Sequence, residues 1–520
     1  MSSLALVVAV GVAILVATGA ARRWGVAPPA LLLIAGVLLG FVPALRAVHL
    51  PPEAVLLLFL PLLLYWESFT SSLREIRSNL RVIVLLSTVL VAATAAGVAV
   101  TAHQFGMPWG PAWVLGAAVA PTDATAVGVL GRILPRRLGA TLRAESLVND
   151  GTALVIYALA VGVTLGEEHV SAPRVGGMFA LSYLGGIAIG AVVTYAGIQV
   201  RRRLSDPFQH NVLAILTPLT AYLVAELVEV SGVLAVVVCG LWVGRISPRF
   251  FPSRVRQYVR TVMSFLTTLA NAVLFVLIGL EAQSAVRDLS SVGVVTGALM
   301  VVVISAVVVA VRFGWMFTSP YLIRAVDRRD SQRARRLGAR PRVVMAAAGF
   351  RGAVSLAAAL SVPETLHSGA PFPDRDLIIF VTAGVIAVTL VVQAPLLPRV
   401  LRWARLGEDG SAEEERRRAE IAATERALEV LPGLAAELGT DDAIAGQLRA
   451  EYEEHLRVLR DGGGPGARDK AADLRLAVIA RKHEAILRMR DRGEIDDAVL
   501  VRLQGLLDME AVNLAMRRGS

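Results

Sequence analysis

The sequence predicts an all-α protein that crosses a membrane many times and ends in a helical tail outside the bilayer. Of its 520 residues, 55% are apolar and only 18% are charged, whereas soluble globular proteins carry roughly 25% charged residues. Apolar stretches of about 18 residues or more recur up to residue 402, and each is long enough to cross a bilayer as a helix. The composition excludes a soluble enzyme, a disordered chain, collagen and a disulfide scaffold.

Thirteen spans are predicted from these stretches. No basic residue precedes the first one, and Arg22 and Arg23 follow it. A secretory signal has the opposite order, with its basic residues in front, so the first segment is interpreted as a retained helix. The spans run approximately over residues 3–20, 27–45, 51–69, 80–103, 109–131, 139–167, 174–200, 211–228, 231–246, 257–282, 290–320, 343–362 and 376–402.

The loops between the spans alternate between arginine-rich and arginine-poor. Basic residues stay on the cytoplasmic side, so the odd number of spans places the N-terminus outside and the C-terminus in the cytoplasm of a multi-pass cell-membrane protein. The net charge of +10 is spread over these loops, so we expect the lipid bilayer and no nucleic acid as a partner. The rich loops contain Arg22, Arg74, Arg132, Arg201, Arg249 and Arg324.

The chain is predicted to form two domains, a transmembrane domain over residues 1–405 and a cytoplasmic helical tail over residues 406–520. Apolar residues recur at helical spacing over residues 411–460 and again over 467–518. Between them, the glycine-rich segment that starts at Asp461 is typical of a flexible break. Two interpretations stay open: a solvated helical hairpin that packs on itself or on a dimer mate, and a regulatory module.

Two residues inside the spans are interpreted as structural. Cys239 is the only cysteine, so it cannot form an internal disulfide and is a poor metal site alone. Its apolar neighbours predict a buried side chain. Asn271 in the tenth span is interpreted as a polar contact between helices. No cofactor is predicted.

The fifth span contains the polar segment Pro121-Thr122-Asp123. A proline in mid-span removes a helical hydrogen bond and clashes with the carbonyl one turn earlier. The freed backbone groups are tolerated at membrane depth only where they line a cavity or are buried in protein. We therefore predict a broken helix with a carboxylate beside the break; the alternative is a simple kink capped by Asp123.

The sixth span contains Glu145, Ser146, Asn149 and Asp150. Ser146 and Asp150 are four residues apart and share one helix face. Ionisable residues at membrane depth mark functional sites, and oxygen ligands that converge on one point suit a small monovalent cation. Burial disfavours the charged carboxylate, so Asp150 can also bind a proton. The alternative is a polar network that only joins helices.

The twelfth span carries Arg351 between Gly349 and Gly352. An arginine in mid-span needs a partner, for which Glu145 and Asp123 are candidates. The fifth and twelfth spans are seven apart and so run in opposite senses. Two interrupted spans at matching places in inverted halves are typical of a transporter site. The alternative is an arginine that reaches to the membrane surface.

Taken together, Pro-Thr-Asp, Glu-Ser-Leu-Val-Asn-Asp and Gly-Phe-Arg-Gly-Ala-Val-Ser-Leu resemble the motifs of sodium/proton exchangers of the cation:proton antiporter type-one family. The resemblance covers residues 1 to about 402, and the tail resembles that of bacterial members. It implies a homodimer, with a dimerisation domain and a core domain in which two broken helices cross. Some relatives have a proline directly after the aspartate of the broken span, where this chain has Ala124.

The resemblance also implies roles for individual residues. Asp150 would exchange the cation for a proton, and Glu145 would form a structural salt bridge with Arg351. The further residues expected at the ion site are Thr122 and Ser146 as ligands, Asp123 and Asn149 as residues that shape it, and Glu67 as an acid on the third span.

The leading hypothesis is electroneutral exchange of Na+ for H+ by alternating access, with Li+ as a further cation, so no enzymatic activity is expected. K+/H+ exchange on the same scaffold is the nearest alternative. A cation channel would need a continuous polar path, but the acids cluster at one depth. An intramembrane aspartyl protease would need Asp123 and Asp150 to share a proton, and the sequence contexts typical of that family are absent.

Overall fold

The computed structural model describes most of the chain. The residues outside the description are 1, 25–26, 43–54, 79–82, 124–133, 167–171, 205, 252, 290–291, 327–337, 407–410, 461–464, 493, 495–498, 501–502, 505–506, 508–509 and 512–520. All regular structure in the described residues is helical. Contacts divide the chain into two units, residues 1–408 and 409–520, and each is described by itself.

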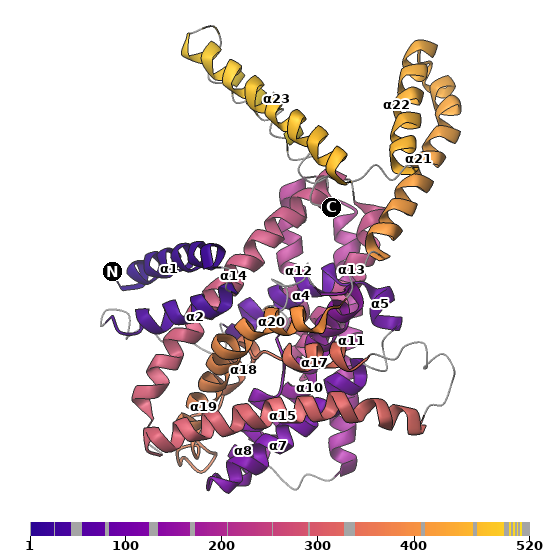
Figure 1. The fold of residues 1–520 in the computed structure, drawn as a ribbon. Coiled ribbons are helices and arrows are strands. Elements are labelled where there is room, and N and C mark those ends of the chain that lie inside the picture. Colours follow the sequence, from indigo (N-terminus) through magenta and orange to yellow (C-terminus); the bar gives the residue numbers. More distant parts are fainter. Residues whose placement is uncertain are drawn as a thin grey trace. The chain divides into compact units, whose positions relative to one another are not determined.

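The first unit is a helical bundle (Figure 1). Its helices are α1 (Ser2–Trp24), α2 (Pro28–Leu39), η2 (Val55–Phe59), α4 (Leu60–Thr70), α5 (Leu73–Ser78), η3 (Leu85–Leu90), α7 (Val91–Gln104), α8 (Trp109–Val119), α10 (Arg136–Leu165), α11 (Ala172–Arg201), α12 (Pro207–Leu227), α13 (Gly232–Phe250), α14 (Ser253–Asp288), α15 (Val294–Val326), α17 (Ala339–Ala347), α18 (Ala353–Leu360), α19 (Arg375–Val388), η4 (Thr389–Gln393) and α20 (Ala394–Ala404).

The described helices confirm a polytopic membrane protein. Eight of them are long and apolar enough to cross a membrane, and shorter apolar helices occupy four further places in the described residues. Each of the thirteen predicted ranges overlaps at least one helix. The number of thirteen membrane crossings itself stays a prediction, as do the positions of the two termini relative to the membrane.

Two helices break where the sequence predicts it, and the breaks cross each other. Helix α8 ends at Val119, just before Pro121, and α17 and α18 are separated by Ala348–Gly352. The Asp123 backbone N–H donates a hydrogen bond of 2.8 Å to the Phe350 carbonyl, which makes an isolated antiparallel bridge. The later part of the predicted fifth span, from Ala124, lies outside the described residues. The described residues therefore confirm that α8 ends at the predicted break, that the twelfth-span helix is interrupted, and that the two interruptions cross.

Two glycines make this crossing sterically possible. A Cβ at Gly352 would overlap the Asp123 carboxylate. A Cβ at Gly349 would lie 2.5 Å from Cδ of Arg312, a side chain that passes directly over this glycine. Gly349 thus leaves room for the Arg312 side chain, and Gly352 leaves room for the Asp123 side chain.

A π-helical turn, η4, supports the broken helix. The Gln393 side chain donates a 2.8 Å hydrogen bond to the Ala347 carbonyl at the end of α17. The Thr389 hydroxyl accepts a 3.3 Å hydrogen bond from the Arg351 backbone N–H. Backbone groups at a helix end need such partners when they are buried. The polar side chains of η4 therefore satisfy part of the backbone that the break leaves free.

The second unit contains α21 (Ser411–Leu438), α22 (Asp442–Arg460) and α23 (Pro465–Asp491). Gly439, with φ of 62°, directly follows α21, and the Asp441 carboxylate caps α22 by accepting from the Ala443 N–H at 3.1 Å. The Arg460 side chain lies 2.6 Å from Glu425 and links α22 to α21. The predicted helical tail is confirmed, whereas the predicted flexible break at 461–464 lies outside the described residues.

Candidate functional site

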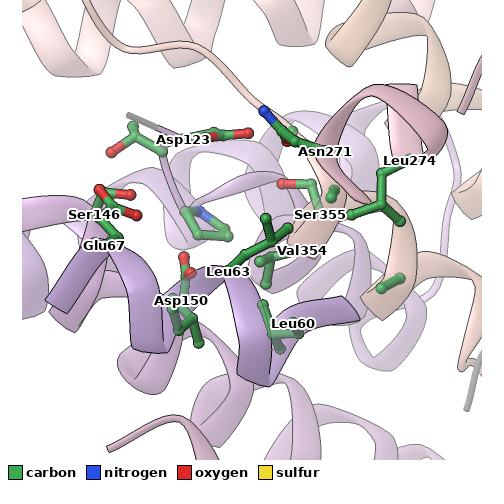
Figure 2. Close-up of a pocket in the computed structure, with 16 residues that line it drawn as sticks. Leu60, Leu63, Glu67, Asp123, Ser146, Asp150, Asn271, Leu274, Val354 and Ser355 are labelled. Atoms are coloured by element: carbon green, nitrogen blue, oxygen red, sulfur yellow. The ribbon is translucent and has the colours of Figure 1, made fainter. Parts of the chain in front are cut away.

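A cavity of about 40 Å³ lies where α4, α10, α14 and the two breaks meet. Figure 2 shows Glu67, Asp123, Ser146 and Asp150 on one side of it and Asn271 and Ser355 on the other. Its apolar lining includes Leu60, Leu63 and Leu274. Of the six predicted ion-site residues, the cavity is lined by Glu67, Thr122, Asp123, Ser146 and Asp150, but not by Asn149.

Asp150 is the most informative of these residues. It is 4% exposed and lines the cavity. Within the described part of the chain, its carboxylate forms neither a hydrogen bond nor an ion pair. A buried charge without a partner is strongly unfavourable, so this carboxylate needs either a proton or a cation from outside the protein.

The lining of the cavity is acidic. Among the described lining residues, Glu67, Asp123 and Asp150 contribute carboxyl groups, and none is an arginine, lysine or histidine. Arg143 interacts electrostatically with Glu67 from outside the cavity. Carboxylates that share one site cannot all stay ionised without a compensating positive charge. The arrangement can therefore hold a small cation, or protons in its place.

Asp123 is placed at the positive end of a helix. Its carboxylate lies against Gly352, which directly precedes α18. A helix N-terminus carries a partial positive charge that stabilises an anion. The aspartate of one broken helix thus compensates the dipole of the other, and the crossing is electrostatic as well as steric.

Asn149 organises the site without lining the cavity. Its Nδ2 donates to the Thr122 hydroxyl at 2.8 Å and to the Thr122 carbonyl at 3.2 Å. The Thr122 hydroxyl in turn donates to Glu145 at 3.2 Å. The amide therefore satisfies a carbonyl that the break next to Pro121 exposes, and it fixes the position of Thr122 at the cavity wall.

The predicted salt bridge between Glu145 and Arg351 is wrong. Glu145 pairs instead with Arg312 of α15, with Nη1–Oε1 and Nη2–Oε2 distances of 2.5 and 3.1 Å. Both residues are almost fully buried, at 1% and 2% exposed. Two parallel hydrogen bonds from one guanidinium make the strong, directional form of this interaction.

Arg351 serves the backbone rather than a carboxylate. Its Nε donates to the Val119 carbonyl at 3.0 Å, and its Nη1 donates to the Gly349 carbonyl at 2.6 Å. Both carbonyls belong to interrupted helices, so they lack helical partners. Backbone carbonyls at the two breaks thus accept from Nε and Nη1 of Arg351. Because Gly349 has no side chain, Arg312 can pass beside it and reach Glu145.

Sequence reasoning missed several residues of this region. Arg312 lies in the apolar segment Val-Ala-Val-Arg-Phe-Gly, and the rule that singled out Arg351 applies equally to it. Asn271, interpreted as a contact between helices, lines the cavity. Ser355 also lines it, and its hydroxyl is 1% exposed without a hydrogen-bond partner in the described structure.

Comparison with protein-family models gives a match over residues 10–403 to the transmembrane sodium/hydrogen exchanger family. The chain belongs to the sodium/hydrogen exchanger family. The resemblance inferred from the three motifs is therefore confirmed, and so is the expectation of a transporter rather than an enzyme. The aspartyl protease hypothesis is abandoned.

Relatives of this exchanger carry matching names. An uncharacterised Na+/H+ exchanger of Mycobacterium bovis is 42% identical over 98% of this chain and 96% of its own length. A sodium, potassium, lithium and rubidium/H+ antiporter of Bacillus pumilus is 31% identical over 70% of this chain and 56% of its own length. The sodium proton antiporter MjNhaP1 of Methanocaldococcus jannaschii shares the fold, with a TM-score of 0.59 and 18% identity over 77% of this chain and 99% of its own.

Proposed function

We propose that this exchanger moves Na+ in one direction and H+ in the other across the cell membrane, by alternating access of the cavity to the two sides. Membership of the family supports cation/proton antiport in general. The observation that carries the specific proposal is the Asp150 carboxylate, which is buried at the cavity without a partner among the described residues. Such a group binds a cation or a proton, and the two compete for it.

The remaining ligands are supplied by the same cavity wall. Ser146 lies one helical turn before Asp150 on α10, and the Thr122 oxygens lie at the break next to Pro121. Glu67 adds a carboxylate from α4, and Asp123 supplies negative charge from the crossing point. Hard oxygen ligands of this kind suit alkali cations better than soft metals. Li+ fits the same set as a smaller cation.

Exchange is proposed to be one for one. Asn149 cannot titrate, and in electrogenic relatives a second aspartate stands at its place. Glu145 is occupied by its salt bridge with Arg312, and Asp123 is compensated by the N-terminus of α18. Glu67 is proposed to act as a cation ligand. Asp150 is then the one acid that alternates between a proton and a cation, so one positive charge enters for each that leaves.

K+/H+ exchange on the same scaffold is the second candidate. The Bacillus pumilus relative is named as an antiporter of sodium, potassium, lithium and rubidium. Because the polar lining is the same for any alkali cation, the size of the cavity decides the preference.

The proposed assembly follows the family resemblance. We propose a homodimer in which residues 1–405 carry out transport, with the N-terminus outside and the tail of residues 406–520 in the cytoplasm. The tail is proposed to be a peripheral module, because its helices form a contact unit of their own.

Transport by purified protein in proteoliposomes tests the proposal. Vesicles with a pH gradient and an internal pH-sensitive dye are given Na+, Li+ or K+ in turn. Proton movement that saturates with Na+ and Li+ is expected, with weaker movement for K+. A response to K+ equal to or greater than that to Na+ would establish the second candidate instead, and current without proton movement would indicate a channel.

A further inference from the structure

A second cavity, of about 10 Å³, lies beside the last residue of α11 and the first turns of α14. It is lined by aromatic and basic side chains, and no carboxylate is among the described lining residues. These residues are Tyr65, Trp66, Phe69, Arg201, Ser247, Phe251, Val255, Arg256, Val259 and Met263.

Arg201 is the central residue of this cluster. It is 5% exposed, and its Nη2 has no hydrogen-bond partner in the described structure. Its Cζ lies 5.4 Å from the centre of the Phe251 ring, and the guanidinium also interacts with the Tyr65 hydroxyl. Both neighbours are neutral, so the positive charge of Arg201 is buried without a counter-charge among the described residues.

Two more basic side chains surround Phe251. Arg256 donates through Nη1 to the Phe251 carbonyl. His210 is 3% exposed, its ring lies 5.9 Å from the Phe251 ring, and its Nδ1 has no hydrogen-bond partner in the described part of the chain. Asp206 interacts with His210 electrostatically, but it is exposed, and its carboxylate caps α12 by accepting from the Phe208 N–H at 3.0 Å.

The other buried arginines among the described residues, Arg312 and Arg351, both have acceptors for their side-chain donors. Arg312 is paired with a carboxylate, and Arg351 donates to two backbone carbonyls. Arg201 has neither kind of acceptor at Nη2. Buried charges in proteins are paired or they bind an ion. A buried basic cluster that has an unused donor, with no acid among the described residues of its cavity, is therefore suited to bind an anion.

We propose that the Arg201 cluster binds a phosphate-type anion. Guanidinium groups form strong, charge-assisted hydrogen bonds with phosphate oxygens. A cavity of this size accepts about one oxygen atom, because it is close to the smallest space that holds a water molecule. The rest of the anion lies outside, next to Arg256, which is only partly buried.

Two sources of such an anion exist, the headgroup of an acidic phospholipid and free phosphate. The cluster lies at the ends of spans whose loops are rich in arginine. Acidic lipids attract basic segments of this kind. Helices α4 and α14 line this cavity and also the acidic one. The anion would thus be bound by two helices that also shape the cation site, although its binding does not depend on the proposed transport.

Thermal unfolding of the full chain in detergent tests this site. Sodium phosphate is compared with sodium chloride at equal ionic strength, and dioleoyl phosphatidylglycerol with dioleoyl phosphatidylcholine at equal concentration. Arg201→Gln is the test variant. Arg203→Gln is the matched control, because Arg203 carries the same charge two residues away and is exposed.

The wild type and Arg203→Gln are expected to gain several degrees in Tm with phosphatidylglycerol, and Arg201→Gln is expected to gain none. A gain with sodium phosphate would identify free phosphate as a sufficient ligand, and a gain with phosphatidylglycerol alone would identify a lipid headgroup. Equal gains for wild type and Arg201→Gln, equal gains with phosphatidylcholine or chloride, or no gain in the wild type would overturn the proposal. If Arg201→Gln does not fold, Arg256→Gln replaces it, with retained phosphatidylglycerol counted by native mass spectrometry.

Discussion

Two acids of α10, five residues apart, have opposite surroundings. Glu145 is 1% exposed, and its carboxylate accepts hydrogen bonds from Nη1 and Nη2 of Arg312 and from the Thr122 hydroxyl. Asp150 is 4% exposed and has no hydrogen-bond or ion-pair partner among the described residues. Burial and residue type are therefore nearly the same, and the set of described partners differs.

We propose that this difference gives the two residues different tasks. A paired carboxylate contributes to structure, and its loss leaves a buried cation without a partner. An unpaired carboxylate at a cavity is available to an ion. The polar wall between them, made of Thr122 and Asn149, belongs to both regions, since Thr122 contacts Glu145 and lines the cavity. Variants on each side should therefore separate transport from stability.

The largest effect is expected for Asp150→Asn. Proton-coupled Na+ transport should fall to the level of empty vesicles, because the amide binds neither a proton nor a cation in exchange. The Tm in detergent should stay equal to that of the wild type or rise, since an unpaired buried charge is removed. Transport and Tm are measured on the same preparation.

Asp442→Asn on the exposed tail helix α22 is the matched control for this substitution, and it should leave both quantities unchanged. Transport by Asp150→Asn near the wild-type rate would remove this residue from the mechanism. A large loss of Tm would place Asp150 with Glu145 among the structural acids.

The next largest effect is expected on stability, for the Glu145–Arg312 pair that Thr122 also contacts. Glu145→Ala and Arg312→Ala should each lower the free energy of unfolding by about 3–5 kcal/mol, the usual result when one partner of a buried pair is removed. Because both remove the same interaction, the double variant should lose much less than the sum. Chemical unfolding of reconstituted protein measures the four forms of the cycle.

A second cycle makes this test specific. Glu145→Ala combined with Arg351→Ala should show weaker coupling than Glu145→Ala combined with Arg312→Ala, because Glu145 acts on Arg351 through its charge and not through a hydrogen bond. Arg351 has carbonyl acceptors of its own. Strong coupling in this second cycle, and none in the first, would restore the pairing that the sequence predicted.

The same comparison shows how far the sequence alone reaches. The acids at the site were predictable because a charge in an apolar span is costly, and the rule needs no knowledge of neighbours. The breaks were predictable because Pro121 and the glycines around Arg351 act on their own backbone. The buried acids of α10 and the positions of the two breaks therefore follow from local sequence, whereas the crossing of the helices was implied by the family resemblance.

The choice of partners was not predictable in the same way. Glu145 had two candidate arginines in apolar spans, Arg312 and Arg351. The choice between them depends on which backbone carbonyls the crossing leaves free, and that is a property of the packed structure. Gln393 and Thr389 are similar cases, since their role depends on the π-helical turn that turns them toward the break.

A smaller effect is expected at Gln393. Gln393→Met keeps the size of the side chain but leaves the Ala347 carbonyl without its 2.8 Å hydrogen bond. An unsatisfied buried acceptor costs about 1–3 kcal/mol, and the Ala347 carbonyl is only half-buried, so the Tm should fall by less than in the Glu145 and Arg312 variants. Val391→Met, on the exposed face of the same turn, is the control. Equal Tm values for the two variants would mean that η4 does not support the break.

The last prediction is that the membrane potential does not change the cation gradient at equilibrium. Glu145 is bound by Arg312, Asn149 has no proton to exchange, and Asp123 lies at the positive end of α18. Asp150 alone is then free to alternate between a proton and a cation, and one charge crosses in each direction. The measurement uses proteoliposomes with a K+/valinomycin potential and a fixed pH gradient, in which the final Na+ ratio should not change with the potential. Glu67 is the remaining acid among the described residues of the cavity wall, so Glu67→Gln is measured alongside. It should raise the Na+ concentration for half-maximal rate and leave the ratio independent of potential. A Na+ ratio that follows the potential in the wild type but not in Glu67→Gln would show that Glu67 carries a second proton, and the division of labour between Asp150 and Glu145 would then have to include α4.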